Sequence, residues 1–343
     1  MSSDSTINLY PPSIFHHPSW YKVLSKSYGF EVIRIGSQNS FSNKPSIISF
    51  PESIMDNNHS EQTIPFVIKK KGKQVKYISL PFSDEVTLLH SKKINENIIS
   101  GILQTSDNIS IELRCKYEGD GFKNKLIGHK HLLDLTQESK IIFNTFKKTQ
   151  VQQPIQKAIK EGLSGEVRID FDAMTEFYKL HLITRKKLGI PIQPKRFFFH
   201  FFHEIIKNNL GFIVLVSIGK KVISAGIFAG ANKTITYKFS ASHPEYLTYR
   251  PNNLMLWTAI LESKKRGFEV FDFGRTDLET KGLRKFKQGW GTIEEPLYYS
   301  YYPEIPDKTK FIFIKNNIVT PVIKHSPGFV CQWTGEVLYK YFG

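Results

Sequence analysis

The sequence contains few residues of the kinds that cross-link a chain or anchor it in a membrane. Only two of its 343 residues are cysteines, Cys115 and Cys331. Two such distant cysteines exclude a disulfide scaffold and a cysteine-based zinc knuckle, and they favour structural thiols in a reducing compartment. No run approaches the about 18 uninterrupted apolar residues that indicate a membrane span, and the start of the chain has no basic segment followed by an apolar one. We therefore expect a cytoplasmic protein that is at most peripheral at the inner membrane face.

Acidic residues are scarce relative to basic ones. The chain has 31 Asp and Glu against 47 Lys and Arg, which gives a formal net charge of +16. Such a charge favours nucleic acid, phosphorylated substrates or an anionic membrane face, and it does not choose among them. A nucleic-acid-binding protein is therefore one hypothesis, although charge alone supports it.

Several sequence motifs that indicate common active sites are absent. The chain has no G-x-S-x-G, no P-loop and no G-x-G-x-x-G after a strand. His200 and His203 share a helical face among phenylalanines, but two histidines without a third ligand indicate a core or boundary position. We expect no metal site.

The composition is that of a globular protein with a substantial core. Apolar residues make up 40% and charged residues 23%, and the length favours two domains. Hydrophobic periodicity and turn residues predict, from residue 171 on, two helices, a meander of three antiparallel strands, a helix, a buried strand, a second helix and a closing strand. The predicted ranges are 171–188, 195–209, 212–218, 221–230, 233–241, 251–266, 268–273, 278–290 and 294–302.

The first half of the chain repeats this order less clearly. A helix is predicted over 17–29, a hairpin over 64–83, a helix over 91–104 and a strand over 108–118. We therefore expect an N-terminal domain over 1–165 and a C-terminal domain over 166–304. The segment 136–163 is helical in pattern and should bridge them, and the tail 305–343 should pack back on the first domain.

The element order and several motifs resemble a known family. The order resembles the GNAT (acyl-CoA N-acyltransferase) fold, and "RPNNLMLWTAILESKKRGFEVFDFGRTDLETKGLRKFKQGWG" is similar to the C-terminal signature of FemAB-like proteins. "FHHPSWYKVLSKSYG", "LPFSDEVTLL" and "TRKKLGIPIQPKRFF" are further matches, closest to the branch associated with exopolysaccharide and PEP-CTERM protein sorting. The resemblance implies an α/β (α+β) fold of two tandem GNAT-like domains, each a mixed sheet flanked by helices.

The resemblance also implies a function. FemAB-like proteins are N-acyltransferases or aminoacyltransferases that modify an amine on a cell-envelope precursor, either a peptidoglycan peptide or an amino sugar of a surface polysaccharide. It implies an anionic nucleotide- or lipid-linked acceptor and no permanently bound cofactor. The acyl donor would be aminoacyl-tRNA or acyl-CoA, and "RPNNLM" stands where CoA-binding members have R-x-x-G-x-G/A. The alternative is a non-catalytic GNAT scaffold that binds an envelope precursor or a partner.

Lys287 is the main candidate for catalysis. In a helix over 278–290, Leu283, Phe286 and Trp290 form an apolar stripe, and Lys287 falls beside it. An inward-facing ammonium either snorkels to solvent or serves a site. The resemblance favours the second alternative, because Lys287 matches the lysine of the family's FK motif, which would stabilise the developing oxyanion.

Four further candidates lie at strand and helix ends in the C-terminal half. Asp272 and Arg275 lie at the end of the strand "FEVFDFG", where open α/β sheets bind ligands. The guanidinium there either holds a phosphate or carboxylate or forms a salt bridge, with Asp272 or between the domains. Asn252 and Asn253 follow Pro251 at the start of a helix, where they either bind an anion or cap the helix.

Three candidates complete the predicted site. Asp84 matches a position where the family presents an acidic residue near the acceptor amine, and would orient that amine or relay its proton. A helix N-cap at Ser83 or Asp84 explains the residue equally. Arg114 is a candidate of the same kind. Arg185 would contact an acceptor phosphate, or else it stabilises a helix C-terminus.

Overall fold

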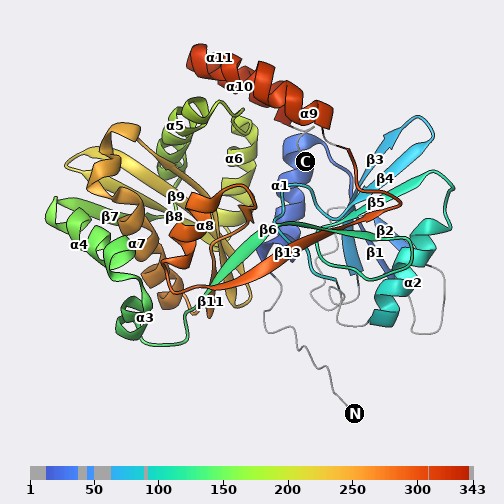
Figure 1. The fold of residues 1–343 in the computed structure, drawn as a ribbon, viewed down its shortest axis with the longest axis horizontal. Helices are drawn as coiled ribbons and strands as arrows, with labels where there is room; N and C mark the ends of the chain where they lie inside the picture. Colours follow the sequence, from blue (N-terminus) through green and yellow to red (C-terminus); the bar gives the residue numbers. More distant parts are fainter. Residues whose placement is uncertain (1–12, 38–44, 50–62, 89–91, 308, 340–343) are drawn as a thin grey trace. The chain divides into compact units, whose positions relative to one another are not determined.

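The chain divides into two compact units, which we describe separately. The computed structural model describes all residues except 1–12, 38–44, 50–62, 89–91, 308 and 340–343 (Figure 1). Unit 1 comprises residues 1–9, 24–128 and 296–306, and unit 2 comprises residues 10–23, 129–295 and 307–343. Both units are mixed α/β structures, as the sequence predicts.

Unit 2 contains a mixed sheet in the order β7-β8-β9-β10-β11-β6. Neighbouring strands from β7 to β10 are antiparallel, which confirms the predicted meander, whereas β10 and β11 are parallel. β8 is almost entirely buried, as expected for a strand covered on both faces. The strands are β7 (Leu163–Arg168), β8 (Gly211–Ile218), β9 (Lys221–Ala231), β10 (Thr234–Ser242), β11 (Val270–Asp272) and β6 (Lys123–Asp134).

Helices cover both faces of this sheet (Figure 1). α5 (Phe171–Leu188) packs on β8 to β10, together with α6 (Lys195–Phe201), and ends where Gly189 adopts φ +69°. α7 (Pro251–Lys265) packs on the opposite face, together with α3 (Ser139–Thr145) and α4 (Gln153–Lys160). α7 connects the parallel strands β10 and β11. α8 (Lys281–Gln288) follows β11 and is shorter than the predicted helix.

Unit 1 has the same strand pattern. Its sheet runs β2-β1-β3-β4-β5-β13, with antiparallel neighbours except for the parallel pair β4 and β5. α2 (Lys92–Leu103) lies between those two strands in the chain, as α7 lies between β10 and β11. The strands are β1 (Val32–Ser37), β2 (Pro45–Ser49), β3 (Thr63–Lys71), β4 (Gln74–Ile78), β5 (Ile109–Leu113) and β13 (Ile293–Tyr302), and α1 (Pro18–Tyr28) precedes them.

The two units exchange their last strands, which changes the expected domain boundaries. β6 follows β5 in the chain, but its residues 132–134 pair with β11 in unit 2. β13 follows α8 of unit 2, but its residues 300–302 pair with β5 in unit 1. Residues 129–165 therefore belong to unit 2, where the sequence placed the boundary after residue 165.

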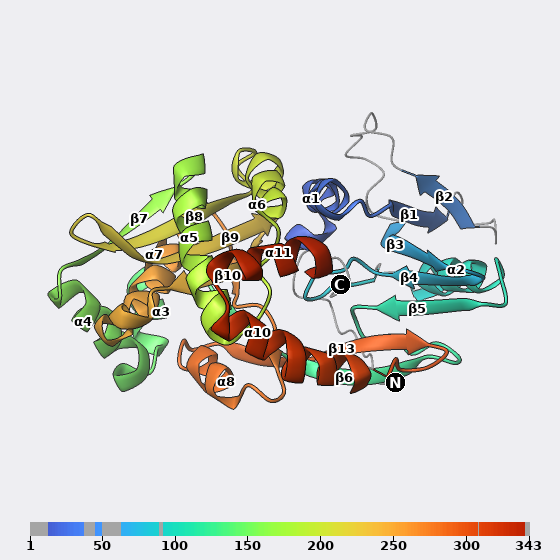
Figure 2. The same cartoon turned by 90° about the horizontal axis from the view of Figure 1, so that it is seen from above.

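The C-terminal tail also belongs to unit 2 rather than packing on the first domain. It forms α9 (Thr309–Ile314), the π-helix η6 (Lys315–Val319), α10 (Thr320–His325) and α11 (Gly328–Leu338). α10 and α11 contact α5 (Figure 2). Ile192, Ile323 and Cys331 form the buried centre of this contact. Among the described residues, no helix is long and apolar enough to cross a membrane.

Gly335→Ala should weaken the packing of α11. A Cβ added there would lie 1.9 Å from the carbonyl oxygen of Ile192, so the helix would have to move, and overpacking typically costs about 1–3 kcal/mol. Gly282→Ala in α8 is the control, because an added Cβ there meets nothing within 4 Å and alanine is the better helix former. We expect urea unfolding to show a lower free energy of unfolding for Gly335→Ala only. Equal stability of both variants would contradict this packing.

Candidate functional site

The parallel pairing of β10 with β11 is short and ends at a turn. Residues 234–236 pair with residues 270–272. β10 then continues to Ser242 beside β9, whereas β11 ends at Asp272. In open α/β sheets, ligands bind beyond the carboxyl ends of parallel strands. The residues that follow β10 and β11 therefore form the candidate site of unit 2.

The turn after β11 is shaped by Asp272. The backbone N–H of Gly274 donates to Oδ1 of Asp272 at 2.8 Å, and Gly274 adopts φ +70°, which favours glycine. Arg275 follows, half-buried, and its Nε donates to Oδ1 of Asp277 at 2.8 Å. Arg275 thus forms an ion pair with Asp277, and its assignment to a phosphate or carboxylate stays a prediction.

Lys287 binds this turn from α8. Its Nζ donates to the carbonyl oxygens of Gly274 at 2.8 Å and Arg275 at 3.1 Å, and the residue is only 3% exposed. These hydrogen bonds compensate part of the cost of burying an ammonium. The snorkelling alternative is wrong. The predicted stripe is also wrong at Leu283, which is 42% exposed.

A cluster of polar side chains lies close to Lys287. Glu294 accepts hydrogen bonds from Nε of Arg284 at 2.8 Å and Nε2 of Gln288 at 2.9 Å, and it contacts Nε2 of His131 at 3.0 Å. The Arg284 hydrogen bonds are the main reason that the pKa of Glu294 falls to about 2. Burial, followed by the charge of Lys287, lowers the pKa of His131 to about 4. At neutral pH the carboxylate is charged and the imidazole is neutral.

The sequence analysis did not identify this cluster. Residues 129–131 lie within β6, and His131 is fully buried. The available signal was the alternation of His131 with the buried Leu133, which places the imidazole on the inward face of a strand. Its partner Glu294 lies more than 160 residues further along the chain, so no local pattern joins them.

Asn252 and Asn253 are turned into the fold. Oδ1 of Asn252 accepts hydrogen bonds from the hydroxyl groups of Ser224, at 2.8 Å, and Ser242. Nδ2 of Asn253 donates to the backbone oxygen of Gln150 at 3.4 Å, and Asn253 is 6% exposed. The N-cap residue of α7 is Arg250, whose side chain makes no cap hydrogen bond. The two amides anchor the start of α7 to the neighbouring elements.

Arg185 is also held by the backbone. Its Nε and Nη2 donate to the carbonyl oxygen of Pro191 at 3.1 and 2.8 Å. It also hydrogen-bonds the hydroxyl of Tyr339, whose pKa is raised by burial. The guanidinium therefore links the end of α5 to the segment that follows it.

In unit 1 the loop after β4 carries Asp84. Residues 84–88 form a loop, so the N-cap alternative is wrong. Leu80 and Phe82 adopt φ +51° and +64°, which is strained backbone for such side chains. The hydroxyl of Tyr299 donates to the backbone oxygen of Asp84 at 2.9 Å. The loop is thereby held in one conformation around a half-buried carboxylate.

Arg114 supports the same loop. It follows β5, is 8% exposed, and its Nη1 donates to the backbone oxygen of Ser83 at 2.8 Å. Its Nη2 lies 3.4 Å from Glu112, and its guanidinium lies over the ring of Tyr299. The structure thus places Arg114 as a support of the loop.

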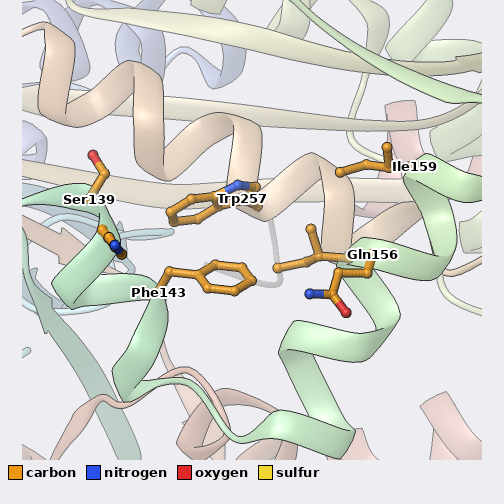
Figure 3. A pocket seen from close by; sticks show the side chains of 7 residues that line it. Ser139, Phe143, Gln156, Ile159 and Trp257 are labelled. Carbon is orange, nitrogen blue, oxygen red and sulfur yellow. The ribbon is translucent and has the colours of Figure 1, made fainter.

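One open pocket is lined by none of these residues. It has a volume of about 310 Å³ and lies among α3, α4 and α7 (Figure 3). Its lining residues are Ser139, Lys140, Phe143, Ile155, Gln156, Ile159 and Trp257. In the part of the chain that the structure describes, no group of three or more His, Cys, Asp or Glu side chains is placed to hold a metal ion.

His131→Gln should reduce the acid sensitivity of the fold. The histidine pKa is about 4 in the folded protein against 6.5 in a free side chain, so the unfolded chain binds a proton first as the pH falls from 6.5 to 4. The fold loses stability over this window, by at most about 3 kcal/mol. Glutamine keeps a donor for Glu294 but does not titrate. We expect urea unfolding to show that the free energy of unfolding falls less for the variant than for the wild type between pH 6.5 and 4. Above pH 7 it should change with pH equally in both proteins.

Part of unit 2 matches a known protein family in sequence. Residues 147–287 match the family described as acetyltransferase (GNAT) domain. The matched segment contains β7 to β11 with their helices, and it ends at Lys287. No curated protein is significantly similar to the chain in sequence.

Similar solved structures show the same fold. FemX matches with a TM-score of 0.65 and 14% identity, over 88% of this chain and 94% of its own. The C-terminal domain (DUF2156) of a putative lysylphosphatidylglycerol synthetase from Agrobacterium fabrum has a TM-score of 0.50 and 12% identity, over 70% and 81%. L-PGS from Bacillus licheniformis has a TM-score of 0.50 and 12% identity, over 74% and 85%. Residues 147–287 thus match a GNAT acetyltransferase domain, and the chain shares its fold with FemX.

Proposed function

We propose that this protein is a FemAB-like N-acyltransferase or aminoacyltransferase that modifies an amine on a cell-envelope precursor. The observation that carries the proposal is the buried ammonium of Lys287, fixed at the carboxyl end of β11 inside the GNAT domain. The motifs that resemble FemAB-like proteins and the fold shared with FemX support it. The acceptor is a peptidoglycan peptide or an amino sugar on an anionic nucleotide or lipid carrier, which suits the net charge of +16.

The reaction requires a neutral amine and a stabilised oxyanion. The amine nitrogen attacks the acyl carbonyl, so that a C–N bond forms and negative charge develops on the carbonyl oxygen. The C–O bond of an ester donor, or the C–S bond of a thioester donor, then breaks. The amine loses a proton to a base, and the leaving group departs as a hydroxyl or a thiol. The positive charge of Lys287, held in a dry environment, would lower the energy of the oxyanion.

The start of α7 favours aminoacyl-tRNA as the donor. A glycine-rich loop would present backbone N–H groups to the pyrophosphate of CoA, but this chain has Pro251, Asn252 and Asn253 there. The two amide side chains hydrogen-bond within the fold. A tRNA donor would instead use the excess of basic residues. We propose aminoacyl-tRNA as the co-substrate, and acyl-CoA is the donor that the assays must compare with it.

We assign Asp84 to the acceptor amine. Its loop is fixed by Arg114 and Tyr299, so the carboxylate is presented without a flexible backbone. A carboxylate that accepts a hydrogen bond from the amine would orient its lone pair and take up its proton. Arg114 is then a positioning residue.

Lys287→Met should abolish transfer while the fold is retained. The substitution keeps the length of the side chain but removes the charge, and loss of one oxyanion-stabilising group costs about 10²–10³ in rate. Lys285→Met, at an exposed position of the same helix, is the control. The measurement is mass spectrometry of envelope precursors from cells that lack the gene and carry either variant or the wild type. We expect one amine-linked acyl or aminoacyl group to disappear with Lys287→Met only.

Two checks make this result decisive. Thermal unfolding of the purified variants shows whether Lys287→Met is folded, and assays with aminoacyl-tRNA and with acyl-CoA identify the donor. A folded Lys287→Met protein that restores the modification would overturn the catalytic assignment and favour the non-catalytic scaffold.

Asp84→Asn should slow transfer most strongly at low pH. An amide cannot take up the proton of the amine, and loss of such a group costs about 10²–10⁴ in rate. The difference in rate between the variant and the wild type should shrink as the pH rises, because more of the acceptor amine is then neutral in solution. Glu85→Gln, the neighbouring carboxylate, is the control. Initial rates between pH 6 and 9 are the measurement, and a deficit that is independent of pH would contradict the assignment.

A further inference from the structure

The C-terminal helices of unit 2 expose many large apolar side chains. Eight of them are more than 40% exposed, and Phe329 and Trp333 reach 67% and 65%. Contiguous exposed apolar surface on a globular protein usually marks an interaction site. The eight residues are Ile312, Phe313, Ile314, Ile318, Val322, Phe329, Trp333 and Val337. We call the surface that they form the C-terminal helical face.

The spacing of the exposed residues in α11 is that of an amphipathic helix. In α11, Phe329, Trp333 and Val337 follow one another at intervals of four, on one side of the helix. The other side holds the buried Cys331 and Gly335. α10 and α11 pack on α5 through their buried sides (Figure 2), so the apolar stripes are left outward.

The charges beside this face are mostly positive. From Lys315 to Leu338 the chain contains two lysines and one acidic residue, Glu336, whose carboxylate lies 3.3 Å from Nη1 of Arg196. The basic end of α5 adjoins α10, since a Cβ added at Gly189 would lie 3.0 Å from Cγ of Lys324. The exposed apolar stripes thus have a basic border.

We propose that the C-terminal helical face docks this protein on the surface of an anionic phospholipid bilayer. Helices that lie in a membrane interface combine exposed Trp, Phe and aliphatic residues with lysines. The charge pattern argues against a second copy of the chain, because two such faces would bring like charges together. Nucleic acid binds chiefly through phosphate contacts and would leave the aliphatic residues unused.

This proposal does not depend on acyl transfer. Lys287, Asp272 and Asp84 lie on other elements, and lipid binding can be measured without donor or acceptor. Failure of either proposal would therefore leave the other one standing. The probes are vesicles of phosphatidylglycerol with phosphatidylcholine and vesicles of phosphatidylcholine alone.

The first measurement is co-sedimentation of the full chain with both kinds of vesicle. We expect the wild type to bind the anionic vesicles and to release them at high salt. The double variant Phe329→Ser, Trp333→Ser should bind at least about tenfold more weakly, because it removes two exposed aromatic anchors. Ile159→Ser, which removes an apolar side chain with 57% exposure on α4 of the same unit, is the control and should bind as the wild type does.

The second measurement follows the environment of Trp333. Trp20 and Trp290 are fully buried and Trp257 is half-buried, so Trp333 is the most exposed of the four tryptophans. Its emission should shift to shorter wavelength on anionic vesicles. Trp333→Phe should lose this shift and still co-sediment, because phenylalanine also partitions into the interface.

Three results would overturn the proposal. The first is a wild type that anionic vesicles do not retain, and the second is a double variant that binds them as tightly as the wild type does. The third is a wild-type dimer in sedimentation velocity that the two substitutions dissociate, which would make the face a contact between two copies. Circular dichroism of the double variant shows whether its fold is intact.

Discussion

One buried ammonium connects the elements of the candidate site. Lys287 projects from α8 and binds the two carbonyl oxygens at which β11 turns away from the sheet. α8 is fixed in turn by the hydrogen bonds of Arg284 and Gln288 to Glu294, at the start of β13. Burying a charge costs free energy unless hydrogen-bond partners surround it. The turn after β11, α8 and the start of β13 therefore depend on one another.

The candidate residues of both units occupy equivalent places. In unit 2, Asp272 ends the second strand of the parallel pair and Arg275 follows it, and Asn252 lies at the start of the helix that comes after the first strand. In unit 1, Asp84 follows β4 and Arg114 follows β5, which are again a parallel pair. The two units thus use the same edge of the same strand pattern, but they place different chemistry there. Unit 2 presents a buried ammonium, and unit 1 presents a carboxylate on a strained loop.

The sequence predicted features that short-range patterns determine. The start of α7 at Pro251 and the end of α5 at Leu188 follow from local backbone preferences, and the inward position of Lys287 follows from helical periodicity. Features that depend on distant pairing could not be predicted this way. The contact of His131 with Glu294 and the packing of the tail on α5 join segments more than 100 residues apart. The sequence also left a helix N-cap at Ser83 or Asp84 open, because serine and aspartate favour caps and turns alike.

The exchange of β6 and β13 has a consequence for the order in which the chain can fold during synthesis. The sheet of unit 1 ends with residues 300–302, which a ribosome makes nearly 200 residues after β5. Until then β5 lacks its neighbour on one side and has unpaired backbone groups, which are prone to pairing with other chains. Unit 2, by contrast, receives β6 before any of its other sheet strands is made. The N-terminal unit therefore begins first and is completed last.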